Sequence, residues 1–478
     1  MTMSMTLIAA VFLPLVLSPL VLLAGRWPNL REAITLVTGG VTFLIVLSIL
    51  PEVMAGGRPA VELLEVLPGL TLGFRVEPLG MLFGLVASGL WIVTSLYSIG
   101  YMRGHHEIDQ TRYYFFFAVA ITAAIGVAFS QNLLTLFIFY EVLTLSTYPL
   151  VTHARTPEAM RGGRIYMGIL LSTSVVFLLF AVIWTWSITG TLEFQEGGIL
   201  SGKASEGVVC ALLALYAFGT GKAALMPFHR WLPAAMVAPT PVSALLHAVA
   251  VVKAGVFTVM KIIVYVFGLD LLQETDVSVW LMYVAGATVI ISSLVAMTKD
   301  NLKARLAYST VSQLSYIVLG AALADGLGII GGSMHIAMHA FGKITLFMCA
   351  GAINVALHKT EISDMVGIGR QMPFTMIAIL IRALSVIGVP PLGGAWSKWY
   401  LALGAASADQ LIFVAVLMIS SLLNIAYLMP IVVRAFFNPK TAAPASFGAA
   451  ATHGDGHGDG FHEAPFFCVM PLCFTALG

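Results

Sequence analysis

One carboxylate stands almost alone in an apolar stretch of the chain. Glu141 lies within FIFYEVLTLSTYPLVTH (residues 137–153), where nearly every neighbour is apolar or carries a hydroxyl group. The sequence has 23 Asp and Glu residues, and Glu141 is the one that we expect deep within a bilayer-spanning helix. An ionisable side chain at that depth is costly, usually faces the interior of a helix bundle, and is a functional candidate whose partner should be sought.

A lysine close to a proline is the first candidate for that partner. Lys222 lies in LYAFGTGKAALMPFHRWLP (residues 215–233). We expect Pro227 to break the helix just past the lysine, because proline cannot donate a backbone hydrogen bond. Interrupted helices at bilayer depth are tolerated where they are buried or line a watery cavity, and they are typical of transporter sites.

The same combination recurs later in the chain. SVIGVPPLGGAWSKWY (residues 385–400) places Pro390 and Pro391 just ahead of Lys398. Two broken helices, each with a lysine at mid-membrane depth, indicate an internal repeat. The alternative is two unrelated kinks whose lysines extend toward the membrane surface.

Three titratable residues share one face of another predicted helix. In HIAMHAFGKITLF (residues 335–347), His335, His339 and Lys343 are spaced i, i+4 and i+8. This row suits proton relay, because histidine titrates near neutral pH. A metal site is an alternative, since two histidines four residues apart can chelate, but no carboxylate lies in the same span to complete it. Histidines whose nitrogens are satisfied by backbone groups are the other alternative.

LLHAVAVVKAG (residues 245–255) adds two further candidates. Lys253 is central in its span and we expect it in the interior. His247 is a possible member of a proton path, because it is six residues away and turned about 120° from Lys253 around a helix. Lys261 lies near the end of the span, where we expect its side chain to extend to the membrane surface. Arg382 is deep but cannot relay protons, so we expect an electrostatic or structural role.

These residues together predict proton translocation. Glu141 beside a lysine would form a buried ion pair, and parting such a pair would release or accept a proton. The sequence contains no nucleophile elbow, nucleotide-binding loop or redox motif. We therefore predict a transporter subunit with no cofactor and no covalent catalytic site.

The composition is that of an integral membrane protein. Of 478 residues, 59% are hydrophobic and 10% are charged, with a mean hydropathy of +0.95, whereas about a quarter of the residues of a soluble domain are charged. The four cysteines show no CxxC spacing, so neither an iron–sulfur cluster nor a zinc site is indicated. The net charge of +1 and the lack of a basic patch argue against nucleic acid.

The apolar runs predict an all-α protein of about 14 transmembrane helices. The last run, residues 465–478, is too short to span a bilayer, and we interpret it as the start of a final helix that is cut short, or alternatively as a re-entrant end. The runs near the required twenty residues fall at about 5–25, 33–50, 79–101, 113–130, 132–152, 165–189, 207–227, 242–267, 277–298, 306–324, 327–357, 372–392 and 410–433.

The orientation follows from the basic residues of alternate loops. One set of loops holds only Arg58, Arg75 and Lys203. The other holds fifteen Lys and Arg, which predicts a multi-pass protein of the cell (inner) membrane with this side cytoplasmic and the N-terminus outside. The fifteen are Arg26, Arg31, Arg103, Arg112, Arg155, Arg161, Arg164, Arg230, Lys299, Lys303, Arg305, Lys359, Arg370, Arg434 and Lys440.

Several motifs in one order carry a family resemblance. From about Pro78 to Arg434 the chain resembles the antiporter-like subunits shared by Mrp cation/proton antiporters, respiratory complex I and membrane-bound hydrogenases. The motifs are PLGMLFGLVASGLWIVTSLYSIGYM (residues 78–102), NLLTLFIFYEVLTLSTYPL (132–150), KAALMPFHRWLPAAMVAPTPVSALLHA (222–248), DNLKARLAYSTVSQLSY (300–316) and GVPPLGGAWSKWY (388–400).

The resemblance implies a fold and a set of roles. The fold would be fourteen helices with two inverted five-helix repeats, whose seventh and twelfth helices are discontinuous. Residues 1–110 would form helices 1–3, 111–270 the first repeat, 271–437 the second, 438–464 a flexible cytoplasmic loop and 465–478 the start of a final helix. The implied proton-transfer residues are Glu141, its partner Lys222, the relay lysine Lys253, the central His335, His339 and Lys343, and Lys398 at one end of the path.

Details within the resemblance favour a D-type Mrp subunit. Lysine at position 398, where a middle complex I subunit carries glutamate, argues against that subunit, and Ser315 replaces a usual glycine. The implied partners are Mrp A-, B-, C-, E-, F- and G-type subunits, the lipid bilayer, H⁺, and Na⁺ or K⁺. Alternatives are a proton-pumping subunit of a hydrogenase or NADH dehydrogenase, a subunit of an inorganic-carbon uptake complex, and a non-conducting scaffold.

A Gly- and His-rich stretch lies near the end of the chain, HGDGHGDGFHE (residues 453–463). We interpret it as a flexible connector or, alternatively, as a metal-binding loop.

Overall fold

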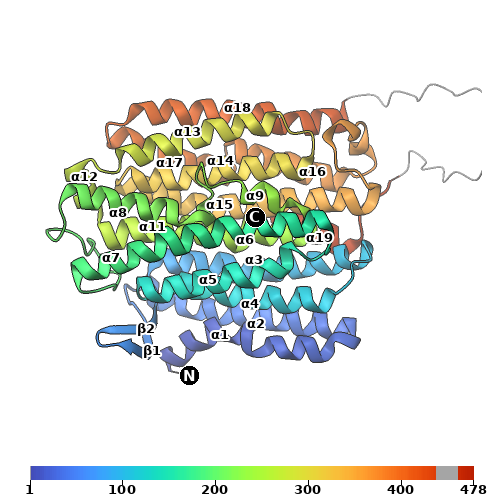
Figure 1. The fold of residues 1–478 in the computed structure, drawn as a ribbon. Coiled ribbons are helices and arrows are strands. Elements are labelled where there is room, and N and C mark those ends of the chain that lie inside the picture. The colour runs from blue at the N-terminus through green and yellow to red at the C-terminus, as the bar shows by residue number, and fades with distance from the viewer. Residues whose placement is uncertain (1, 438–460) are drawn as a thin grey trace, which may run out of the picture.

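The computed structural model describes residues 2–437 and 461–478, and it is built almost entirely of helices. Figure 1 shows them lying side by side in a bundle, with α1 and α2 at one edge and α18 at the opposite edge. Residues 438–460 of the predicted loop 438–464 lie outside the described residues, and with them all but the last three residues of the Gly- and His-rich stretch 453–463.

Within the described ranges, ten helical stretches are long and apolar enough to cross a membrane. With three shorter apolar helices and the more polar α14 (Leu302–Ala322), the described part of the bundle has the fourteen membrane helices predicted, of which the last, α19, has only 12 residues. The ten comprise α1 (Met3–Leu23), α2 (Pro28–Met54), α3 (Pro78–Gly104), α4 (Gln110–Ala128), α5 (Leu133–Val151), α6 (Pro157–Thr173) with α7 (Leu179–Thr189), α10 (Thr240–Ala244) with α11 (Val251–Ile262), α13 (Val279–Met297), α15 (Gly326–Leu357) and α18 (Leu411–Phe436). The shorter three are α8 (Glu206–Gly219), α16 (Pro373–Ile387) and α19 (Phe466–Leu477), and α17 (Gly393–Ser407) continues α16. The connectors α9 (Trp231–Ala234) and α12 (Leu269–Thr275) are too short to span.

Two matching helix starts display the inverted repeat. Asn132 precedes α5 and its side chain accepts a hydrogen bond from the backbone of the first turn, as Asn301 does before α14. The amide of Asn132 donates to Glu193 over 3.0 Å, and that of Asn301 donates to Glu361 over 2.8 Å. Because α5 and α14 begin at opposite ends of the bundle, the same arrangement occurs once at each end.

The first broken helix differs from the prediction in its break point. Helix α8 ends at Gly219, and Lys222 lies in a separate short turn, Gly221–Ala223. The break therefore precedes the lysine, whereas the sequence predicted that Pro227 would interrupt the helix after it. Lys222 thus sits on irregular backbone within the break.

The second break lies where the sequence predicted it. Helix α16 ends at Ile387 and α17 begins at Gly393, so Pro390 and Pro391 occupy the gap and Lys398 lies on the second half. A π-helical turn that was not predicted, Leu245–Val249, lies between α10 and α11 and holds His247.

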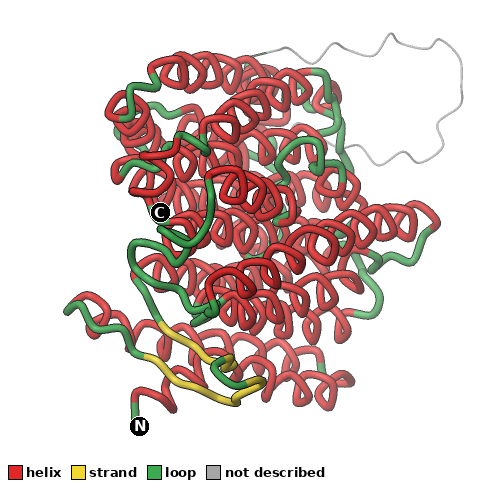
Figure 2. Tube along the Cα trace, turned by 60° about the vertical axis from the view of Figure 1, so that its left-hand side comes forward, coloured by secondary structure: helices red, strands yellow, loops and turns green. Residues whose placement is uncertain are grey.

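A β-hairpin that the sequence analysis did not identify covers one end of the bundle, which we call the hairpin end. Strands β1 (Ala60–Leu67) and β2 (Leu70–Arg75) pair antiparallel between α2 and α3. Figure 2 shows this yellow hairpin beside otherwise red helices. The turn requires a positive φ of 78° at Gly69, which glycine adopts without strain.

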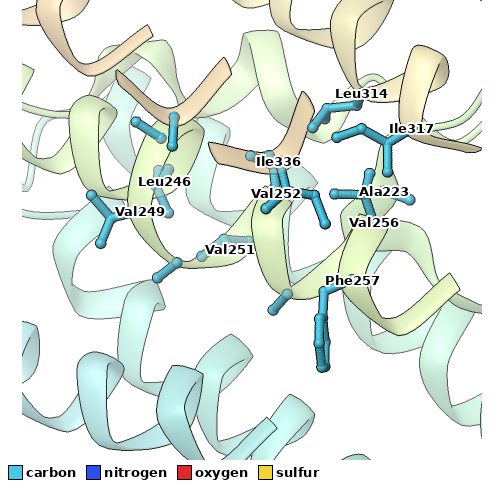
Figure 3. Packing of buried hydrophobic residues seen from close by; sticks show 14 of the residues in the cluster. Ala223, Leu246, Val249, Val251, Val252, Val256, Phe257, Leu314, Ile317 and Ile336 are labelled. Atoms are coloured by element: carbon cyan, nitrogen blue, oxygen red, sulfur yellow. The ribbon is translucent and has the colours of Figure 1, made fainter. Parts of the chain in front are cut away.

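Helix α11 lies at the centre of the apolar core. In the stretch Thr240–Phe267, 89% of the most apolar window is buried. Figure 3 shows Val252 and Val256 of this helix close to Ile336 and Ala223, which come from other elements. A Cβ added at Gly255 would collide with the backbone of Lys222 and Ala223. The glycine therefore allows the turn that carries Lys222 to pack directly on α11.

Candidate functional site

Lys222 is fully buried and held by one face of α5. Its Nζ donates to the carbonyl of Tyr140 over 2.9 Å and to Oγ1 of Thr144 over 2.5 Å. The same Nζ lies 3.2 Å from the centroid of the Tyr140 ring, a cation–π contact. In addition, the Lys222 backbone N–H donates to the Tyr140 hydroxyl over 3.1 Å. Neutral groups of α5 thus enclose the ammonium.

Glu141 lies close to this lysine but does not touch it. Both of its carboxylate oxygens are buried and accept no hydrogen bond from the residues that the structure describes. Its charge acts on Lys222 electrostatically, yet the expected contact ion pair is not formed. The reason is helical geometry, because Tyr140 and Thr144 share one face of α5 while Glu141 is turned about 100° from Tyr140. This conformation therefore holds the two charges apart.

A hydrogen bond joins the two halves of the chain at the centre of the site. Nζ of Lys253 on α11 lies 2.6 Å from Nδ1 of His339 on α15. Both residues are buried. When His339 is neutral and protonated at Nε2, its Nδ1 accepts a hydrogen from the lysine. The sequence placed both residues in the proton path without predicting that they touch.

His335 continues the row on α15. Its ring centroid is 6.0 Å from that of His339, and the two rings are stacked. Nδ1 lies 2.9 Å from the hydroxyl of Ser397, and Nε2 lies 3.1 Å from Oε1 of Gln313. Protein side chains therefore occupy both nitrogens of His335.

Lys398 lies next to Ser397 and ends the row at the second break. Its Nζ donates to the carbonyl of Ile387 over 2.9 Å and to the hydroxyl of Ser421 over 3.0 Å. The Ile387 carbonyl is available because carbonyls at the end of a helix lack intrahelical partners. The Tyr316 ring lies between the two titratable groups, 5.3 Å from the ring of His335 and 5.2 Å from Nζ of Lys398.

Lys343, the third member of the α15 row, and the nearby His247 make no hydrogen bond to the two histidines of that row. Nζ of Lys343 donates to the hydroxyl of Ser309 over 2.6 Å, and that hydroxyl lies 2.8 Å from the hydroxyl of Tyr427. His247 is buried against the Phe347 ring, with 4.6 Å between centroids. Neither of its nitrogens has a hydrogen-bond partner in the described part of the chain. His247 is therefore near the row without being bonded into it.

Two basic residues have partners that the sequence did not reveal. Lys261, expected to reach the membrane surface, is instead fully buried and lies 3.1 Å from Oε2 of Glu77, because the loop before α3 folds over the end of α11. Arg382, for which no partner was predicted, donates both Nε (2.8 Å) and Nη2 to the carbonyl of Thr475 in α19. It thereby fixes the last helix to α16.

Sequence reasoning missed the neutral members of the site. They are the hydrogen-bonding and aromatic side chains between the charges: Tyr140, Thr144, Ser309, Gln313, Tyr316, Ser397 and Ser421. Most lie within the motifs that carry the family resemblance, a signal that could have identified them.

No group of three His, Cys, Asp or Glu within the described ranges could hold a metal ion.

A match to a known protein family shows which family the chain belongs to. The sequence model of the family described as "NADH:quinone oxidoreductase/Mrp antiporter, TM" matches residues 130–424. This chain belongs to that family of antiporter-like subunits. The matched range contains all the predicted proton-transfer residues: Glu141, Lys222, Lys253, His335, His339, Lys343 and Lys398.

Relatives within the antiporter-like family come from different complexes. The chain is 33% identical over 365 residues to NADH-quinone oxidoreductase subunit N of Desulforudis audaxviator, covering 76% of this chain and 72% of that protein. It is 32% identical to hydrogenase-4 component B of Escherichia coli, covering 69% of this chain and 50% of that protein. It is 30% identical to the putative antiporter subunit mnhA2 of Staphylococcus haemolyticus, covering 68% and 42%. The chain thus spans about half the length or less of the last two relatives.

Solved structures confirm the antiporter-like fold. A chain of the Mrp complex from Dietzia sp. superimposes with a TM-score of 0.87 at 22% identity, covering 100% of this chain and 93% of that one. A chain of the membrane-bound sulfane sulfur reductase, an archaeal respiratory membrane complex, matches with a TM-score of 0.82 at 26% identity, covering 91% and 89%. The chain is therefore a multi-pass membrane subunit of the antiporter-like type.

Proposed function

We propose that this chain moves protons through the membrane along its buried row of lysines and histidines. The observation that carries the proposal is the run of contacts from Lys253 through His339 and His335 to Ser397 and its neighbour Lys398. Each titratable member can bind or release a proton, and hydroxyl groups can pass one between them.

The Glu141–Lys222 pair provides the switch in this proposal. Its members are close but not in contact, and neutral groups hold the ammonium. Contact between Glu141 and Lys222 stabilises the charged form of both residues. Separation of the two side chains favours transfer of the lysine proton to the next group. Because Gly255 packs against the Lys222 turn, movement of the turn is transmitted to α11 and hence to Lys253.

The parent assembly that we propose is a multisubunit monovalent cation/proton antiporter. The partners are then the A-, B-, C-, E-, F- and G-type subunits, and the ion exchanged for H⁺ is Na⁺ or K⁺. The likeness to the Dietzia Mrp complex chain supports the fold that this role needs. In the cell membrane we place the lysine- and arginine-rich end on the cytoplasmic side and the hairpin end outside.

A second candidate is a proton-pumping subunit of a redox complex. The observation that favours it is the 33% identity to NADH-quinone oxidoreductase subunit N over 72% of that relative. Purification of the complex through a tag on this chain separates the two. Copurifying flavin, iron–sulfur or nickel absorbance supports the redox complex, whereas their lack together with Na⁺- or K⁺-dependent exchange supports the antiporter.

The proton path is tested with Glu141→Ala in the full complex. In everted vesicles we expect cation-driven proton movement, followed by a pH-sensitive dye, to fall at least tenfold. The matched control is Glu158→Ala, which removes an exposed carboxylate from the first turn of α6 and should retain exchange. Wild-type exchange in Glu141→Ala would overturn the proposal.

A further inference from the structure

A second buried acid–base pair lies outside the row described above. Lys261 is fully buried, Glu77 is 4% exposed, and 3.1 Å separates their charged atoms. Nζ of Lys261 also donates to the carbonyl of Ser130 over 2.7 Å and lies 4.6 Å from the Phe194 ring. Unlike Lys222, this lysine is in direct contact with a carboxylate.

The position of Glu77 shows that its carboxylate is not used to cap a helix. Glu77 directly precedes Pro78 at the start of α3, where a side chain commonly accepts a hydrogen bond from the first turn. Its carboxylate makes no such bond. The acid is instead directed at Lys261, which lies 184 residues further along the chain.

Charged groups continue from this pair to the surface at the hairpin end. Arg75, two residues before Glu77, pairs with Glu193 over 3.4 Å and donates to the carbonyl of Phe194 over 3.2 Å. The side chains of Arg75 and Glu193 are 29% and 25% exposed. Arg58 pairs with the exposed Glu196 over 3.5 Å at the same end. The buried pair therefore lies directly beneath groups that meet solvent.

On its inner side the pair is separated from the row by an aromatic barrier. Lys253, Phe257 and Lys261 are spaced i, i+4 and i+8 on α11, so Phe257 lies between the two lysines along about 12 Å of helix. The Phe257 ring is 5.6 Å from Nζ of Lys261 and 5.0 Å from the Phe83 ring. Figure 3 shows the Phe257 ring pointing away from Leu314 and Ile317. At the same level, the buried hydroxyl of Thr258 has no hydrogen-bond partner among the described residues.

We propose that Glu77 and Lys261 form the site at which protons pass between the buried row and the hairpin end of the bundle. This inference rests on the proposed proton path. The proton leaves Nζ of Lys261 for Oε2 of Glu77, which leaves an amine and a carboxylic acid. The acid then releases its proton to water beside Arg75 and Glu193. The amine takes up the next proton from Lys253 when the Phe257 ring moves out from between the two lysines.

The rival explanation is a purely structural ion pair, and Lys261→Arg separates the two in the full complex. Arginine preserves the charge and the pairing but does not deprotonate in proteins. We expect the variant to assemble and its exchange in everted vesicles to fall at least tenfold. Exchange within about twofold of wild type would overturn the proposal, because a structural pair tolerates arginine.

The double variant Glu77→Gln/Lys261→Gln covers the case in which arginine does not fit. It leaves no uncompensated buried charge, which is the main cause of instability when one partner is removed. Assembled complex with at least tenfold less exchange supports the proposal. Assembled complex with wild-type exchange overturns it.

A labelling experiment on the wild-type complex needs no variant. A hydrophobic carbodiimide reacts with carboxyl groups in their acid form, so a carboxylate that cycles through that form is modified. Mass spectrometry should find the adduct at Glu77, decreasing as pH rises. An adduct at Glu141 with none at Glu77 would overturn the proposal. The proposed function itself fails only if Glu141→Ala keeps its exchange, so the two failures are distinguishable.

Discussion

At the scale of single residues, neutral groups hold most of the buried lysines. Lys222 is bonded to a carbonyl and a threonine, Lys343 to a serine, and Lys398 to a carbonyl and a serine. A neutral acceptor stabilises an ammonium less than a carboxylate does, so these lysines can give up a proton at lower cost than a paired one. Lys261 is the exception, with Glu77 in contact.

Thr144→Val tests this neutral support at Lys222. The substitution preserves shape but removes the hydroxyl that accepts from Nζ over 2.5 Å. A hydrogen bond to a charged group contributes about 1.5–3 kcal/mol, so we expect vesicle exchange to fall by about tenfold. Thr144→Ser keeps the hydroxyl and should remain within about twofold of wild type. Equal activity of the valine and serine variants would contradict the role given to this bond.

The pH dependence of stability is predicted from two residues outside the spans. Burial, and then repulsion from Arg112, lowers the pKa of His153, which favours its neutral form in the folded chain. Its Nε2 lies 2.9 Å from the carbonyl of Ile108. Its contribution is present above the unfolded pKa of about 6.5 and is lost as pH falls through the folded pKa. We expect His153→Gln to lose fewer degrees of Tm than wild type between pH 7.5 and pH 5.

For Glu107 the predicted change of stability with pH has the opposite sign, so this residue serves as the comparison. Burial raises the pKa of this carboxyl, although His105 and Lys303 partly oppose the effect. Its contribution to stability is present below the unfolded pKa and is lost as pH rises through the folded pKa. Glu107→Gln should therefore gain a few degrees of Tm at pH 7.5 and none at low pH. Parallel pH profiles for Glu107→Gln and His153→Gln would contradict both assignments.

At the scale of helices, close packing on a single glycine positions the first break. Even one methyl group at Gly255 would meet the backbone of the Lys222 turn, and overpacking costs about 1–3 kcal/mol. We expect Gly255→Ala to displace the turn and reduce exchange at least tenfold. Gly168→Ala is the matched control, since that helical glycine has open space around it. Normal exchange in Gly255→Ala would show that the turn is not fixed by this contact.

Among the helix breaks, the hairpin and the buried pairs, the sequence predicted some features and not others. Pro390 and Pro391 located the second break because proline acts on its own neighbours. Pro227 also lies within a break, between α8 and α9, but the helix already ends at Gly219, before Lys222, and the proline did not indicate that earlier end. The Pro-Gly turn at residues 68–69 is a local hairpin signal that was overlooked. The pairing of Lys261 with Glu77 was beyond prediction, since it depends on contacts distant in sequence.

At the scale of the whole molecule, a hydrogen bond between two titratable side chains connects the two halves. Lys253 lies on α11 of the first half and His339 lies on α15 of the second, 2.6 Å apart. If this bond transmits protons or conformational change, the two residues act as a unit. Residues in one network show coupling energies of about 0.5–3 kcal/mol, whereas distant sites are additive.

A double-mutant cycle with Lys253→Arg and His339→Gln measures that coupling. We expect each variant to slow exchange, and the double variant to be at least threefold faster than the product of the two single effects predicts, because either change already disables the shared step. Pairing Lys253→Arg with Glu32→Gln provides the additive comparison, since Glu32 is bonded to Arg31 and Arg103 and shares no partner with Lys253. Additivity between Lys253 and His339 would mean that the halves work independently despite their contact.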